Sequence, residues 1–419
     1  MKNTILGNTG RDAQRLSGTS RWVKVAVAST LLAGCGAASA QSGSLGEAIA
    51  SGKAGLELRY RYERVEQDNP SSDANASTLR TRLNYATGSF AGLAAFVEFD
   101  DVRVIGSERY NNATQLPSAQ TQYSVVADPD GTEVNQLYLS YAGWTDTLFR
   151  LGRQRIIYDN ARFIGNVGWR QNEQTYDAFS LVNTALTDTQ LSYAYIDEVN
   201  RIFGDDSPVG EFDMRSHLLN LGYSGWDLGK LSVYGYFLEF VDAPAASSRT
   251  LGARFAGESA FGSDARLLYA LEYATQDDYK DGASTIDADY YLLELGAAAG
   301  GISGRLGHEV LGVGDSAFTT PLATAHAFNG WADVFLATPA DGLRDTYLKL
   351  AGSLAGTGLA AAYHDFSADR GSAQYGSEIN LQATRSFGRV NMLAKYARYS
   401  ADEFAVDTSK VWLMAQVAF

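Results

Sequence analysis

The feature that most constrains this 419-residue chain is a period of two in its hydrophobicity. In residues 56–63, leucine and tyrosine alternate with glutamate and arginine, and the same alternation recurs in residues 79–85, 93–100, 267–273 and 291–295. Such alternation predicts strands that have one apolar and one polar face. A soluble sandwich would bury the apolar face against a second sheet, whereas a transmembrane barrel would turn it toward lipid.

The connections between the alternating segments distinguish these two folds. Links after even-numbered strands are short, as in 89–92 and 144–146, and links after odd-numbered strands are mostly longer, notably 105–131, 158–174 and 312–343. Short turns at one rim and long loops at the other are typical of outer-membrane barrels. We therefore predict an all-β fold, a transmembrane antiparallel β-barrel of about eighteen strands, with sixteen as the alternative count. The strands are expected near 54–64, 78–88, 93–104, 132–143, 147–157, 175–184, 188–198, 213–224, 230–241, 249–257, 264–276, 288–298, 301–311, 344–354, 358–366, 376–385, 389–399 and 409–419.

Composition agrees with this fold and excludes several others. The chain has 42 glycines and 24 tyrosines but only 7 prolines. A formal net charge of −14 argues against nucleic-acid binding driven by overall charge. The single cysteine, Cys35, rules out a disulfide scaffold. After residue 41 no apolar run reaches the roughly 18 residues that a membrane helix needs.

The first forty residues have the pattern of a cleaved signal peptide. Arg21 and Lys24 precede an apolar stretch at 25–36, and Ala-Ser-Ala at 38–40 forms a cleavage site before Gln41. Such a signal implies export across the inner membrane of a bacterium. A location in the bacterial outer membrane follows from the signal and the predicted barrel together.

A second interpretation of this region is a lipoprotein signal. Residues 32–35, Leu-Ala-Gly-Cys, resemble a lipobox, which would make Cys35 the lipidated first residue of the mature protein. With cleavage after residue 40, the expected organisation is a signal peptide at 1–40, a short periplasmic segment at 41–53 and the barrel at 54–419.

The last strand carries a further mark of the class. Residues 411–419 alternate up to a terminal Phe419. Bacterial outer-membrane barrels commonly end on an aromatic residue that the barrel-assembly machinery recognises. We therefore expect this machinery, outer-membrane lipid and lipopolysaccharide as partners, and no nucleic acid.

Many charged residues fall on the predicted inward face of the strands. The basic residues there include Arg59, Arg61, Arg80, Arg82, Arg150, Arg254, Arg266 and Arg305, and nearly as many acidic residues share this face. These charges could pair across strands and hold the lumen rigid. Alternatively, an unpaired subset could line a constriction and select charged solutes, as charged rings do in pores.

Loop 158–174 differs from the other long links, which are acidic. Its acids balance its arginines, and it contains Phe163, Ile164 and Trp169. Apolar residues of this size are expected to pack, and the barrel interior is the nearest shelter. We therefore predict that the loop folds into the lumen, with Arg162 and Arg170 facing a permeating solute. Asp159 and Glu173 are expected to pair with part of the arginine charge.

These segments resemble the alginate-export family of outer-membrane porins along essentially the whole mature chain. The resembling stretches are Leu58–Glu63, Leu79–Arg82, Phe96–Val102, Asn135–Tyr138, Arg150–Gln154, Arg162–Asn166, Trp169–Asn172, Tyr176–Ala178, Asn329–Asp333 and Gly342–Asp345. The resemblance implies an eighteen-stranded barrel and a pore lined by arginines that attract an anionic polyuronate. The expected function is passive diffusion of anionic solutes, most of all alginate-type polyuronates or oligosaccharides. The alternative is a general diffusion porin without substrate preference.

Catalysis and metal binding are not expected. The chain contains only four histidines. His364 and Asp365 point to opposite faces of a strand, and His326 lies near Asp333 without an obvious serine partner. The acidic stretches at 128–131 and 277–282 lack calcium-loop spacing. No catalytic residue, metal ligand or cofactor is therefore predicted.

The choice between the two signals is testable by mass spectrometry of the purified protein. Cleavage after residue 40 predicts a mature chain that begins with Gln41. A chain that begins with a diacylglyceryl cysteine at position 35 would show that the lipobox is used instead.

Overall fold

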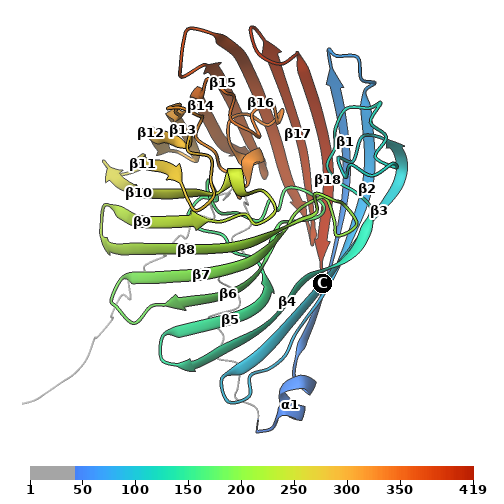
Figure 1. The fold of residues 1–419 in the computed structure, drawn as a ribbon, viewed down its shortest axis with the longest axis vertical. Coiled ribbons are helices and arrows are strands. Elements are labelled where there is room, and N and C mark those ends of the chain that lie inside the picture. The colour runs from blue at the N-terminus through green and yellow to red at the C-terminus, as the bar shows by residue number, and fades with distance from the viewer. Residues whose placement is uncertain (1–42) are drawn as a thin grey trace, which may run out of the picture.

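The computed structural model, which describes residues 43–419, is a closed antiparallel β-barrel (Figure 1). The strands are β1 (Lys53–Gln67), β2 (Ala74–Ala86), β3 (Leu93–Arg109), β4 (Gly131–Trp144), β5 (Thr147–Gln154), β6 (Thr175–Asn183), β7 (Thr189–Asn200), β8 (Glu211–Trp226), β9 (Gly229–Leu238), β10 (Ser248–Phe261), β11 (Ala265–Asp278), β12 (Asp287–Ala299), β13 (Ile302–Leu311), β14 (Leu343–Leu354), β15 (Thr357–Ser367), β16 (Gln374–Phe387), β17 (Val390–Ala401) and β18 (Thr408–Ala418). The prediction of eighteen strands is confirmed. The proposed signal peptide, its cleavage site and Cys35 lie outside the described residues.

Each strand pairs with its neighbours along the chain, and the first strand pairs with the last. The β1–β18 ladder runs from Glu57 opposite Ala418 to Gln67 opposite Thr408. Phe419 extends this ladder, since its N–H donates to the carbonyl oxygen of Leu56 at 2.9 Å. Closure leaves no free strand edge, which is what a sheet in hydrocarbon requires.

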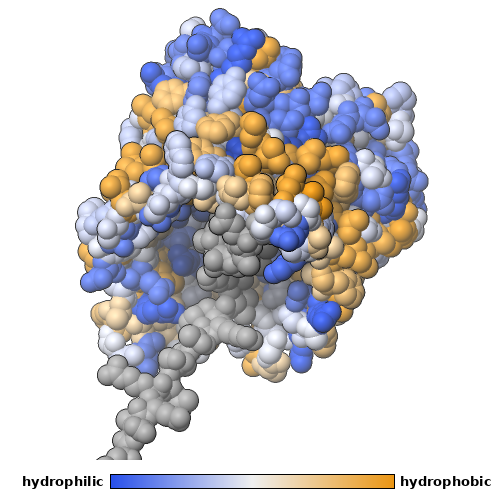
Figure 2. All heavy atoms as spheres, turned by 90° about the horizontal axis from the view of Figure 1, so that it is seen from below, coloured by the Kyte–Doolittle hydropathy of each residue, from blue (hydrophilic) through white to orange (hydrophobic). Residues whose placement is uncertain are grey.

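The wall is apolar outside and polar inside, as the alternation predicts. Exposed leucines on the outward face include Leu83, Leu151, Leu306 and Leu413. Figure 2 shows hydrophobic residues gathered in patches on the surface beside hydrophilic ones. Lipid covers such a face in an outer membrane.

A short helix, α1 (Leu45–Ala50), precedes β1. The Ser44 side chain caps it by accepting a hydrogen bond from the Glu47 N–H at 3.2 Å. Gly88, in the turn after β2, donates its N–H to the Ala48 carbonyl at 2.8 Å. The helix is therefore fixed against the short-turn end of the barrel (Figure 1).

Strand boundaries differ from the prediction where a loop begins inside the barrel. β5 was expected to run to residue 157 but ends at Gln154. The next residue, Arg155, leaves the sheet because its guanidinium binds carboxylates in the lumen, including Glu173 at 2.6 Å. The loops used below are loop L2 (residues 110–130), loop L3 (residues 155–174) and loop L7 (residues 312–342).

The β1–β18 register predicts a specific disulfide. Leu58 lies opposite Val417, and antiparallel partners have Cα atoms about 4.5–5.5 Å apart, which a disulfide can bridge. The L58C/V417C protein should crosslink on oxidation and keep its folded gel mobility after heating. As the control, L58C/Q416C places the two thiols on opposite faces and should not crosslink. Equal crosslinking of both pairs would contradict the register.

Candidate functional site

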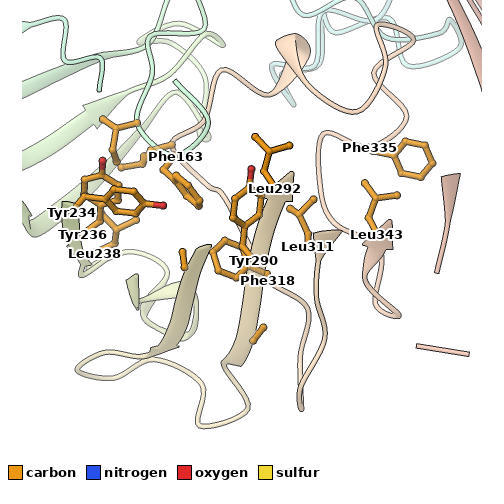
Figure 3. Packing of buried hydrophobic residues seen from close by; sticks show 14 of the residues in the cluster. Phe163, Tyr234, Tyr236, Leu238, Tyr290, Leu292, Leu311, Phe318, Phe335 and Leu343 are labelled. Carbon is orange, nitrogen blue, oxygen red and sulfur yellow. The ribbon is translucent and has the colours of Figure 1, made fainter. Parts of the chain in front are cut away.

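Loop L3 folds into the lumen, as its apolar residues predicted. Phe163 and Ile164 are 8% and 1% exposed. The Phe163 ring packs 5.4 Å from Tyr234 of β9 and 5.2 Å from Tyr290 of β12, between centroids (Figure 3). Burial of side chains of this size stabilises the loop by about 1.5–3 kcal/mol each.

The first strand holds the second half of L3 through Arg59. Its Nε donates to Gln171 Oε1 at 2.9 Å and its Nη1 to the Gly168 carbonyl at 3.1 Å. On the other side, the Gln171 N–H donates to Asp128 of L2 at 2.9 Å. Arg59 therefore binds loop acceptors and is only 5% exposed.

A compact ion cluster joins L3 to β2 and β3. Arg82 contacts Asp100 at 2.5 Å and Glu173 at 2.9 Å. Arg155 binds the same Glu173 and reaches Glu98 at 2.5 Å. Burial alone would raise the pKa of the Glu173 carboxyl, but Arg155 and Arg82 hold it well below its usual value. Glu173 thus stays ionised and bridges the loop to the wall.

Arg61 and Arg80 are also used within the protein. Arg61 contacts Glu63 at 2.8 Å and Asp128 at 3.4 Å. Arg80 binds Glu57 and donates to the Gln171 carbonyl at 3.1 Å. Alternation correctly put these arginines on the inward face, but their partners are loop and wall groups.

Loop L7 lies against L3 inside the barrel. The two backbones exchange hydrogen bonds: Gly165 donates to the Leu322 carbonyl at 2.9 Å, and Thr324 donates to the Ala161 carbonyl at 3.0 Å. Arg162 crosses between them, because its Nε binds Glu309 of β13 at 2.8 Å and its Nη2 binds Asn329 of L7 at 2.9 Å.

The expectation that Arg162 and Arg170 face a solute needs correction. They are 2% and 5% exposed. Arg170 contacts Glu63 of β1 at 3.1 Å and Asp333 of L7 at 3.0 Å. Buried guanidiniums need carboxylate partners, and removing one partner of such a pair costs about 3–5 kcal/mol. Both arginines therefore hold the loops to the wall in this structure.

Asp159 also has a different partner from the one expected. Its carboxylate receives hydrogen bonds from Lys230 at 3.1 Å, Ser232 at 2.6 Å and Asn220 at 2.7 Å. These residues lie on β8 and β9, away from the loop arginines with which Asp159 was expected to pair. Burial would raise the pKa of Asp159, but Lys230 and the two hydroxyl and amide donors lower it.

An aromatic cage around Lys395 joins L3, L7 and the last two strands. Its Nζ lies 4.2 Å from the ring centroid of Trp169 and 3.9 Å from that of Trp331. The same Nζ is 2.7 Å from His326 Nε2, and His326 Nδ1 is 2.5 Å from Asp333. The lysine must donate to Nε2, so the imidazole is neutral and donates from Nδ1 to Asp333.

The charges around His326 explain its protonation. Burial, opposed by the nearby Asp333, lowers the pKa of His326 to about 3. Burial would raise the pKa of Asp333, but His326, Lys410 and Arg170 hold it well below its usual value. The pair is therefore a neutral imidazole beside an ionised carboxylate near neutral pH.

The remaining arginines of the predicted lining lie on the inward face elsewhere in the barrel. Arg254 binds Glu272 at 2.7 Å, Arg266 binds Glu258 at 2.7 Å and Arg305 binds Glu294 at 2.5 Å. Arg150 of β5 lies 5.2 Å from the Tyr138 ring centroid. Of these, Arg266 and Arg305 are exposed by about a third or more of their side chains, 33% and 39%.

Several residues of the site were not selected from the sequence. They are Asp128, Gln171, His326, Lys395 and Lys410, which complete the contacts between loops and wall. Gln171 and Asp333 did stand in stretches that resemble the alginate-export family. Alternation does put Lys395 on the inward face, but nothing in the sequence indicates its partners, and nothing marks Lys410.

No helix in residues 43–419 is long and apolar enough to cross a membrane. Within the same part of the chain, no group of three or more His, Cys, Asp or Glu side chains is arranged to hold a metal ion.

The barrel and its loop-filled lumen define the class of protein, which is an outer-membrane porin by fold. Solved structures agree with this assignment. OpdK of Pseudomonas aeruginosa matches 88% of this chain and 99% of its own at a TM-score of 0.70 and 15% identity. OccAB4 of Acinetobacter baumannii matches 88% and 98% at a TM-score of 0.69 and 13% identity. OccK9 (OpdG) of P. aeruginosa matches 89% and 100% at 0.69 and 15%.

The sequence family agrees with the fold. Residues 52–191 match the model of the family described as "Alginate export". The resemblance seen in the sequence is thereby confirmed over these residues, and the fold agrees with the expected location in the bacterial outer membrane. Comparison with curated protein sequences gives no match.

The neutral state of His326 predicts that the loops loosen in acid. The pKa of His326 is about 3 in the packed loop and 6.5 ordinarily. His326 therefore binds a proton more readily when the loop is open than when it is packed. Packing is therefore fully stable above pH 6.5 and weakens as pH falls toward 3. At about pH 5 the loss is about 2 kcal/mol.

Hydrogen exchange over residues 312–342 measures this effect. After correction for intrinsic exchange, protection should fall between pH 7 and pH 5 in the native protein. In H326Q, whose amide can accept from Lys395 and donate to Asp333, this fall should be smaller, because only other groups in contact with L7, such as Glu378 bound to the Ala332 N–H, can still titrate. An equal change of protection with pH in the native protein and in H326Q would show that His326 does not control the loops.

Proposed function

We propose that the protein is an outer-membrane diffusion channel for small anionic solutes, with uronates and their oligosaccharides as the preferred class. The observation that carries this proposal is the charged lumen narrowed by L3 and L7. A wide barrel passes most small solutes, whereas inward loops bring each solute close to the wall. Charge on the wall can then influence which solutes pass.

Exposed basic groups supply the attraction for anions. Arg305 lies on the inward face of β13 and uses Nη1 in the ion pair with Glu294. A guanidinium has five N–H donors and stays charged at all relevant pH values. One carboxylate partner thus leaves donors for a passing solute.

Likeness to solved proteins supports a carboxylate cargo. OpdK was crystallised with vanillate, an aromatic carboxylate. Uronates carry the same anionic group, and the "Alginate export" family model matches residues 52–191. Vanillate and uronates thus share the carboxylate group that the channel is proposed to attract.

A general diffusion porin is the competing function. The observation that favours it is that most lumenal arginines have a carboxylate partner, as Arg254 does in Glu272. Balanced pairs would produce a wet and nearly neutral pore. The two functions differ in the sign and size of ion selectivity.

The reversal potential across a planar bilayer under a salt gradient tests the proposal. The native channel should favour anions, and oligouronate added to either side should reduce its current. R305Q leaves Glu294 without its arginine partner and should shift the reversal potential toward cation selectivity. The control, R103Q, removes an arginine paired with Asp101 that is 55% exposed on the other face of the wall, and should change nothing. A native channel without selectivity would favour the general porin.

A further inference from the structure

A small cavity opens on the lumen between L3, L7 and the inward faces of β10 and β12–β14. Its volume is about 70 Å³, and its lining includes Asn160, Arg254, Phe328, Asn329, Tyr347 and Lys349. A single water needs about 10–15 Å³ measured in this way. The cavity is therefore large enough for a carboxylate group.

The acidic residues around this cavity are already engaged. Glu309 receives Arg162 at 2.8 Å, and Asp345 receives His364 at 2.9 Å. Glu294 binds Arg305 at 2.5 Å. These carboxylates have cationic or polar partners of their own, so the cavity has little free acceptor capacity for a cation.

The free groups are donors. The side chain of Lys349 has no hydrogen bond or ion pair with any residue in the range 43–419, and its Nζ lies 4.0 Å from the Tyr347 ring centroid. Arg254 uses Nη1 for Glu272, which leaves its other N–H groups available. The side-chain oxygen of Asn160 accepts from the Arg162 N–H. Its side-chain nitrogen has no hydrogen-bond partner among the described residues.

The position of Lys349 in the sheet is unfavourable for stability. It lies directly opposite Arg305 on the β13–β14 ladder. Like charges in directly opposed positions destabilise a sheet. Glu294 attracts both cations, which offsets part of this repulsion.

We propose that this cavity is a subsite for one carboxylate of a permeating acidic sugar. The carboxylate accepts hydrogen bonds from Lys349, Arg254 and Asn160, while the sugar ring stays in the lumen beside Tyr347 and Phe328. Charge-assisted hydrogen bonds of this kind are the strong ones. This inference rests on the proposed function, and it adds the chemical group that is recognised and the residues that recognise it.

Channel block by sodium glucuronate tests the subsite, with glucose as the neutral probe of similar size. In the native channel, glucuronate should reduce the single-channel current at concentrations where glucose has no effect. K349Q should raise the half-blocking concentration of glucuronate about tenfold, and K349R should keep it within about twofold of native. K230Q is the matched control, because Lys230 faces the same lumen but is paired with Asp159 at 3.1 Å and lies outside the cavity.

The outcomes separate the subsite from the channel function. If native and K349Q channels are both anion-selective and are blocked equally by glucuronate, the subsite is wrong and the channel function stands. Equal weakening by K349Q and K230Q would also overturn the subsite, since any lumenal charge would then suffice. A native protein that conducts no ions would overturn the channel function and the subsite together. Folded gel mobility of each variant before heating excludes misfolding as the cause.

Discussion

Closure of the backbone hydrogen-bond ladder is the constraint on which the rest of this structure depends. Hydrocarbon offers no partner to a free N–H or C=O group, so a sheet in lipid must pair its first strand with its last. The pairing of β1 with β18 meets this need. It also fixes a lumen whose wall is polar, because the alternating side chains that do not face lipid must face inward.

That polar interior is filled in an unusual way for a core. In a soluble protein the interior is packed mainly with apolar side chains, but here ion pairs and aromatic rings together fill the interior. Phe163 packs among tyrosines, while Glu173 and Asp333 each hold two cations. Partners on both sides compensate these charges for the loss of water. The loops are therefore attached to the wall by specific pairs that fix their position.

The sequence predicted the strands more completely than the site. Alternation placed Arg59 on the inward face and identified L3 as an inward loop from Phe163, Ile164 and Trp169. It could not say which groups would meet, because Arg59 contacts Gln171 across 112 residues of chain. Arg162 and Arg170 had the chemistry of solute ligands, yet their position beside buried carboxylates makes them attachments of the loop.

The loop attachments cross the seam at which the barrel closes. Arg170 and Asp333 connect Glu63 of β1 with Lys410 of β18. The first and last strands are therefore joined through one residue of L3 and one residue of L7. A slip of one residue in β18 would turn Lys410 toward lipid and break this connection. A lysine that faces lipid near the outer interface costs about 0–1 kcal/mol, and its departure would also leave Asp333 with one cation fewer. The charges inside the lumen thus discriminate between correct and shifted closure during assembly, a selection that backbone pairing alone would not provide.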